Sequence, residues 1–278
     1  MEHRQAGNVG AAFALLFVPL LLFAVPPAAR AETLRLSGTG GAMGGLALLS
    51  SAFERGHPGV KVVLAPNMGS SGSIKAALSG KLDVAVSGRA LNDDERDRGG
   101  REVPYVRTAF VFAVHPDVPV EDITLSAVRK IYAGDTTSWP DGTPARVILR
   151  PASDSDTEVL KGMPEGLASA ADKAYRRKGM VVATTDQDAV DYIQSTPGAI
   201  GTTTLALVLS EKRRVRILSL AGVTPSNRAV KEGAYPYVKV YRFVTGAHPP
   251  GAAKAFIAFA RSPAGASILS GVGCVVTR

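Results

Sequence analysis

The sequence predicts an α/β fold with two lobes, and two observations support this prediction. First, short apolar runs alternate with helical patterns from Leu34 onward, which is typical of a parallel sheet covered by helices on both faces. Second, long strand-like runs at 103–116 and 235–246 lie on either side of a central block. Two extended segments in that arrangement are what a pair of lobes joined by two crossings requires.

The first part of the chain repeats a strand–helix unit. "LRLS" predicts a first strand, and the amphipathic stretch after it predicts a helix. Apolar residues recur at helical spacing in that stretch, at Met43, Leu46, Leu49 and Phe53. "VKVVLAP" predicts a second strand, "SIKAALSG" a second helix ending at Gly80, and "LDVAVSG" a third strand. Because ligands bind at the carboxyl ends of parallel strands, we expect functional loops there.

The central block begins after Pro116 and changes character. It holds a predicted helix at 125–132, a Gly- and Pro-rich segment, and further helix and strand patterns up to "RVRILSL". Two helices are predicted at the C-terminal end, at 251–261 and 264–269. We therefore assign 32–114 and 239–278 to the first lobe and 115–238 to the second.

Residues 1–31 are predicted to be a signal peptide. The segment 6–29 carries no charge, and Ala29-Arg30-Ala31 is the small-x-small pattern that a signal peptidase cuts after. The alternative is an uncleaved membrane anchor, but the prolines at 19, 26 and 27 argue against a spanning helix. We expect a mature chain that begins at Glu32 and acts in the periplasm or outside the cell.

Composition limits the classes of function. Removing 31 of the 278 residues leaves 247 with 30 basic and 23 acidic side chains, a net charge of +7, which favours anionic partners. The single cysteine, Cys274, excludes an internal disulfide and a cysteine-based metal cluster. Basic residues are scattered and aromatics sparse, so we predict no nucleic-acid binding. We expect a monomer.

Three polar loops each follow a predicted strand and precede a predicted helix. They are "SGTGGAMGG" at 37–45, "NMGSSGS" at 67–73 and "RPASDSDT" at 150–157. Such junctions present unpaired N–H groups at the positive end of a helix, and hydroxyls add neutral donors. Arg150 heads the third loop and Arg89 closes "VSGRAL". The alternative is that the serines and aspartates only cap helices. Together the loops predict an anion site.

Other kinds of site fit the sequence less well. "DSDTE" lacks the glycine and the distant glutamate of a calcium loop, and Arg150 disfavours a cation beside it. The histidines at 57, 115 and 248 are isolated in sequence, and no motif pairs a nucleophile with a base. We predict no catalytic residue, no metal and no cofactor. Trp139 is interpreted as a packing residue.

The loops and strands resemble, in order, those of the periplasmic phosphate-binding proteins that feed ABC transporters. The resemblance rests on "LRLSGTGGAMGG", "APNMGSSGSIKAALSGKLDVAVSGRALNDDE", "IYAGDTTSWPDG", "RPASDSDT", "STPGAIGTTTL" and "GAYPYVKVYRFVT". It implies a periplasmic-binding-protein type II fold, in which two α/β lobes joined by a two-strand hinge close on a ligand in the cleft. It also implies delivery of phosphate or a similar oxyanion to an ABC permease.

The resemblance implies a set of ligand-binding residues. In the first lobe these are backbone N–H groups of Ala42 and Met43, the hydroxyl and amide of Ser70, and the neighbouring Ser71 and Arg89. In the second lobe, Arg150 would supply a charged fork, and Ser155, Asp156 and Thr157 would cap the oxyanion from a helix start.

The chain departs from the family pattern at two points. In the family an aspartate follows the serine that is here Ser87, and it accepts the proton of hydrogen phosphate; this chain has Gly88 there. The loop after Arg150 is also one residue longer. We hypothesise that Asp154 or Asp156 restores the missing acceptor from the opposite lobe. The alternatives are a receptor for another oxyanion or a small carboxylate, a sensor or adhesion module that keeps the fold without a permease, or a phosphate-ester hydrolase.

Overall fold

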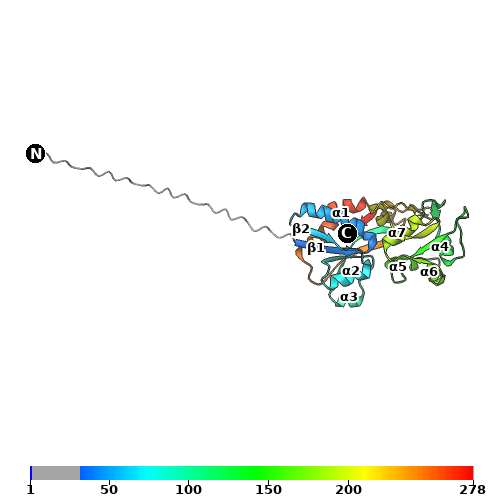
Figure 1. The fold of residues 1–278 in the computed structure, drawn as a ribbon, viewed down its shortest axis with the longest axis horizontal. Helices are drawn as coiled ribbons and strands as arrows, with labels where there is room; N and C mark the ends of the chain where they lie inside the picture. The colour runs from blue at the N-terminus through cyan, green and yellow to red at the C-terminus, as the bar shows by residue number, and fades with distance from the viewer. Residues whose placement is uncertain (2–31, 278) are drawn as a thin grey trace. The chain divides into compact units, whose positions relative to one another are not determined.

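The computed structural model describes Met1 and residues 32–277. Two α/β lobes lie side by side, with α1, α2 and α3 in one and α4, α5 and α6 in the other (Figure 1). The predicted fold class is confirmed. The predicted signal peptide at 1–31 lies outside the described residues apart from Met1.

The first lobe is built from both ends of the described chain. Its N-terminal elements are β1 (Glu32–Gly38), α1 (Gly40–Gly56), β2 (Val60–Leu64), α2 (Gly69–Leu78), β3 (Val84–Ser87) and α3 (Asp93–Asp97). Its C-terminal elements are β11 (Val238–Thr245), α10 (Gly251–Arg261), α11 (Pro263–Ser270) and β12 (Cys274–Val276). β1 pairs in parallel with β2 and β3, and β11 runs antiparallel to β3. α10 and α11 confirm the two helices predicted at the C-terminal end.

The second lobe comes from the middle of the chain. It contains β5 (Asp122–Ile123), α4 (Leu125–Ala133), β6 (Arg146–Leu149), α5 (Ser155–Lys161), α6 (Leu167–Arg176), β7 (Val181–Val182), α7 (Asp186–Ser195) and β8 (Ala199–Thr204). After α8 (Leu205–Ser210), which packs against α1 of the first lobe, the second lobe continues with β9 (Arg216–Ile217), β10 (Ser219–Leu220) and α9 (Asn227–Glu232). β6 pairs in parallel with β7 and β8.

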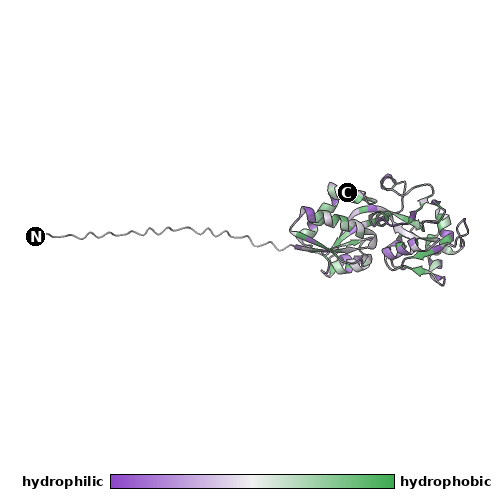
Figure 2. Cartoon of the chain, turned by 45° about the horizontal axis from the view of Figure 1, so that its top comes forward, coloured by the Kyte–Doolittle hydropathy of each residue, from purple (hydrophilic) through white to green (hydrophobic). Residues whose placement is uncertain are grey.

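The strand β4 (Arg101–Val114) is shared by the two lobes. Residues 101–109 pair with β11, and residues 110–114 pair with β8. Tyr105 and Val106 belong to the core of the first lobe, whereas Phe110 and Phe112 belong to the core of the second. Figure 2 shows green, hydrophobic segments in both lobes. The two long strands are confirmed, and the lobe boundaries at 114/115 and 238/239 stay a prediction.

Two helices begin earlier than the sequence pattern indicates. α2 begins at Gly69, so Ser70 and Ser71 of "NMGSSGS" lie in its first turn and Ser73 just after it, rather than in a loop before the helix. Gly69 has a φ of 66°, a left-handed conformation that glycine adopts without strain. α1 likewise begins at Gly40, within the glycine-rich stretch. Glycine content alone suggested loops because glycine has low helix propensity.

Trp139 is buried in the second lobe, as predicted for a packing residue. Its side chain is 5% exposed, and its Nε1 donates to the carbonyl oxygen of Gly198 at 2.9 Å. No helix in the described residues is long and apolar enough to span a membrane.

We expect Gly198→Ala to lower the free energy of unfolding by about 3 kcal/mol. Gly198 has a φ of 74°, and a β-carbon there would approach the carbonyl oxygen of Pro144 to well inside 3.0 Å. The control is Gly179→Ala, where φ is 76° but no atom lies within 4 Å, so only the backbone strain of about 1 kcal/mol applies. Urea unfolding followed by Trp139 fluorescence measures both, and equal losses would contradict the prediction.

Candidate functional site

A cleft of about 350 Å³ brings together most of the residues predicted to bind an anion. Its lining includes Ser70, Ser71 and Arg89 from the first lobe and Arg150, Asp154 and Ser155 from the second. The rest of the lining is Asn67, Met68, Gly69, Gly72, Pro151, Ser153, Thr184 and Thr185. Ala42, Met43, Asp156 and Thr157 do not line it. The starts of α2 and α5 therefore face the same space, as the loop pattern predicted.

The first-lobe side of the cleft is held by hydrogen bonds around Arg89. Its guanidinium donates to both carboxylate oxygens of Glu95, at 2.8 and 2.7 Å, and to the Ser71 hydroxyl at 3.0 Å. This hydrogen bonding lowers the pKa of Glu95. Ser70 Oγ accepts the N–H of Gly88 at 2.9 Å. The charge of Arg89 is thus already compensated by Glu95, while the two serine hydroxyls can still donate.

Arg150 is buried at the end of β6, with only 4% of its side chain exposed. It donates through Nη1 to the carbonyl oxygen of Ala183 at 2.8 Å and through Nη2 to Asp154 at 2.9 Å. Nη2 also lies 3.8 Å from the carboxylate of Asp186. Its Nε has no hydrogen-bond partner among the described residues. The guanidinium therefore retains unused N–H donors, of which the one on Nε is buried without any partner in the part of the chain that the structure describes.

The start of α5 is capped by Asp154, whose carboxylate accepts the N–H of Asp156 at 2.8 Å. Asp154 is thus a helix-capping residue, as the alternative interpretation of this loop predicted. It also forms an ion pair with Arg150. The Thr157 hydroxyl donates to the carbonyl oxygen of Pro151 at 2.9 Å. Of the three residues predicted to cap an oxyanion here, Ser155 alone lines the cleft.

Asp156 forms a buried ion pair with Lys239, a residue that sequence reasoning missed. Each side chain is 1% exposed, and the Lys239 ammonium contacts the Asp156 carboxylate. Burial raises the pKa of Asp156 to about 6, although Lys239 acts to lower it. Burial also acts to lower the pKa of Lys239, but Asp156 and Asp186 raise it, so the ammonium stays charged. Strand alternation was a usable signal, because Lys239 shares a face of β11 with the buried Tyr241 and Phe243.

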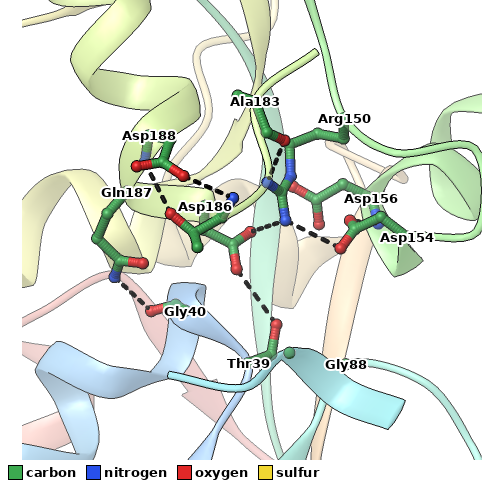
Figure 3. Close-up of polar contacts among 12 residues, drawn as sticks. Thr39, Gly40, Gly88, Arg150, Asp154, Asp156, Ala183, Asp186, Gln187 and Asp188 are labelled. Atoms are coloured by element: carbon green, nitrogen blue, oxygen red, sulfur yellow. Dashed lines mark hydrogen bonds and ion pairs between the residues drawn. The ribbon is translucent and has the colours of Figure 1, made fainter. Parts of the chain in front are cut away.

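Asp186, the first residue of α7, is the second residue that sequence reasoning missed. It accepts the Thr39 hydroxyl at 3.4 Å and faces Arg150 (Figure 3). Burial acts to raise its pKa, but Lys239, Arg150 and the backbone N–H groups of Gly41 and Gly40 lower it. A carboxylate from the second lobe therefore lies at the start of α1, where the sequence predicted a bound anion.

The start of α1 is used within the protein in further ways. The N–H of Ala42 donates to the carbonyl oxygen of Thr39 at 3.1 Å. Gln187 donates to the carbonyl oxygen of Gly40 at 3.2 Å and accepts from Asn67 at 2.9 Å. The two Gln187 contacts join the lobes through protein atoms. The role predicted for Ala42 and Met43 stays a prediction.

We searched the described residues for side chains grouped as metal ligands. They contain no group of three or more His, Cys, Asp or Glu residues placed to hold a metal ion. Asp154, which lines the cleft, is paired with Arg150, and Asp156 beside the cleft is paired with Lys239. The lining contains no histidine and no cysteine.

Comparison with known proteins gives a family match that covers most of the chain. The model described as the PBP superfamily domain matches residues 24–264. Among curated relatives, the phosphate-binding protein PstS of Borreliella burgdorferi is 23% identical over 173 residues, which cover 60% of this chain and 62% of that protein. PstS of Bacillus subtilis is 29% identical over 154 residues, or 54% and 48%. The aligned regions thus span about half to three-fifths of these relatives.

Solved structures share the fold at low identity. A structure from Clostridium perfringens with bound phosphate has a TM-score of 0.76 at 20% identity, covering 89% of this chain and 100% of that one. An ABC-type phosphate transport receptor from Vibrio cholerae has a TM-score of 0.63 at 17% identity, covering 88% and 100%. These findings confirm the resemblance and the fold that it implied.

Asp156→Asn tests the charge state of the buried pair. The folded pKa of about 6 lies above the ordinary 3.8, so this group's contribution to stability is full below pH 3.8 and is lost as the pH rises through 6. We expect the wild type to lose stability relative to Asp156→Asn between about pH 4 and pH 6.5. Urea unfolding across this range measures the difference, with the exposed Asp191→Asn as control. A constant difference would contradict the raised pKa.

Asp186→Ala tests the contact between the lobes. The substitution removes the carboxylate that Thr39 and Arg150 share, so we expect the lobes to separate more often and the radius of gyration to rise. Small-angle X-ray scattering measures it. Asp191→Ala is the matched control, because Asp191 lies on the same helix with 58% of its side chain exposed. An unchanged radius of gyration in Asp186→Ala would show that this contact does not hold the lobes together.

Proposed function

Because this chain belongs to the PBP superfamily domain family, we propose that it is a receptor for inorganic phosphate or a similar tetrahedral oxyanion. It binds the anion between its lobes and delivers it to an ABC permease at the membrane. The observation that carries the proposal is the convergence of Ser70, Ser71, Arg150 and Ser155 on one cleft. Hydroxyls, a guanidinium and helix starts are the groups that bind oxyanions in proteins.

The relatives support the choice of ligand. Two of them are named phosphate-binding protein PstS, and one solved structure of the same fold holds phosphate. In this proposal the leader at 1–31 is removed on export and the mature receptor acts as a monomer outside the cytoplasm.

The proposed function is binding without covalent chemistry. A hydrolase would need a base beside its nucleophile, and the Ser70 hydroxyl accepts from a backbone N–H rather than contacting a histidine. Contacts from both lobes would stabilise the closed form, so affinity and closure are thermodynamically linked.

Isothermal titration of the mature protein tests the proposal. We expect phosphate to bind with one site per chain, and Arg150→Lys to weaken binding at least about tenfold because lysine lacks the planar fork. Arg146→Lys is the matched control, since Arg146 begins the same strand but is exposed. No heat with phosphate, sulfate, molybdate or tungstate would overturn the proposal. Wild-type affinity in Arg150→Lys would overturn the placement of the ligand at Arg150.

A further inference from the structure

Lys239 is a buried cation at the crossing between the lobes. It lies on β11 opposite Thr108 of β4, the strand that the lobes share. Its side chain is 1% exposed, and its partner Asp156 comes from the start of α5 in the second lobe. The charge is therefore placed where the two lobes and the hinge meet, and the proposed function leaves it without a role.

Gly88 makes room for Lys239. A β-carbon on residue 88 would lie well inside 3.0 Å of Lys239 Cε, 3.1 Å from its Nζ and 3.2 Å from the Ser155 hydroxyl. A side chain at position 88 would therefore require the end of the Lys239 side chain to move away from its place beside Asp156. Where the resemblance implied a carboxylate that accepts a ligand proton, this chain has an ammonium group.

The two aspartates that could replace this acceptor are both engaged. Asp156 accepts from the Lys239 ammonium. Asp154 accepts from Arg150 at 2.9 Å and from the N–H of Asp156 at 2.8 Å. A hydroxyl on the ligand would compete with a cation for these oxygens, which weakens the bond that it can make. A ligand oxygen without a proton needs donors alone, and the cleft offers these from Ser70 and Ser155.

We propose that Lys239, admitted by Gly88, sets the ligand class of the cleft, so that it binds tetrahedral oxyanions without regard to their protonation. A fully ionised dianion such as sulfate then binds about as tightly as hydrogen phosphate. The discrimination that a free carboxylate gives, by repelling an anion without a proton, is absent. The inference rests on the proposed function, because Gly88 adjoins Ser155, which lines the same cleft: a β-carbon on residue 88 would lie 3.2 Å from the Ser155 hydroxyl.

The first test compares two anions on the full mature protein. Isothermal titration at pH 7.5 measures the Kd of phosphate and of sulfate, and we expect the two to differ by less than about tenfold. Phosphate binding more than about a hundredfold tighter than sulfate would overturn the inference and leave the proposed function intact. No binding of either anion, nor of molybdate or tungstate, would overturn the proposed function itself.

The second test removes the pair as a unit. Asp156→Asn with Lys239→Met replaces the buried charges by neutral groups of similar size, and we expect both anions to bind at least about tenfold more weakly. Arg228→Met with Glu232→Gln is the control, because this pair on α9 is exposed. Circular dichroism melting verifies that each variant folds. Unchanged affinity in a folded Asp156/Lys239 variant would overturn the role of Lys239.

The third test moves the carboxylate back to the first lobe. The triple variant Gly88→Asp, Asp156→Asn and Lys239→Ala places an acceptor at residue 88 in the space that the lysine leaves. We expect its preference for phosphate over sulfate to rise at least about tenfold above that of the wild type. If the triple variant folds and keeps the wild-type ratio, position 88 does not control the ligand class and the inference fails.

Discussion

The buried contact between Lys239 and Asp156 is the interaction on which the arrangement of the cleft depends. Removing one partner of such a pair leaves an uncompensated charge in the interior and costs about 3–5 kcal/mol. The pair therefore fixes β11, at the crossing between the lobes, against the start of α5. A β-carbon on residue 88 would meet the end of the Lys239 side chain. The ion pair and a side chain at residue 88, just after β3, thus compete for the same space.

Compensation of charge extends through the rest of the cleft. Arg89 is paired with Glu95, and Arg150 with Asp154 and, at longer distance, Asp186. In the proposed function, an anion that enters the cleft meets free hydroxyl donors, whereas Arg89 and Arg150 are already paired with carboxylates. Its gain on binding Arg150 is the difference between its own contacts and those of the carboxylates that it displaces or shares. The overall positive charge of the chain therefore attracts anions without setting their affinity.

Local sequence patterns predicted the strands and helix starts that form the site. The ion-pair and hydrogen-bond partners of its buried carboxylates depend instead on contacts between distant parts of the chain. Arg150 and the start of α5 were predictable because a strand, an arginine and a capping residue follow each other within the nine residues 146–154. The long strands β4 and β11 were predictable from their apolar runs. The partners of Asp156 and Asp186 were not, because Lys239 is 83 residues from Asp156 and Thr39 is 147 residues from Asp186. Such pairs depend on how two lobes pack, which leaves no local period in the sequence.

In the proposed function, Asp186 couples the closure of the lobes to the strength of anion binding. Its carboxylate contacts Thr39 of the first lobe and faces Arg150 of the second, which are the kinds of group that a bound oxyanion would use. A ligand shifts the balance between open and closed forms only by its differential affinity for them. Because protein contacts already join the lobes, a ligand has less closure to drive, but it must compete with Asp186 for the same donors. The contact that stabilises the closed form therefore weakens the hold of Arg150 on an anion, and the two properties oppose each other.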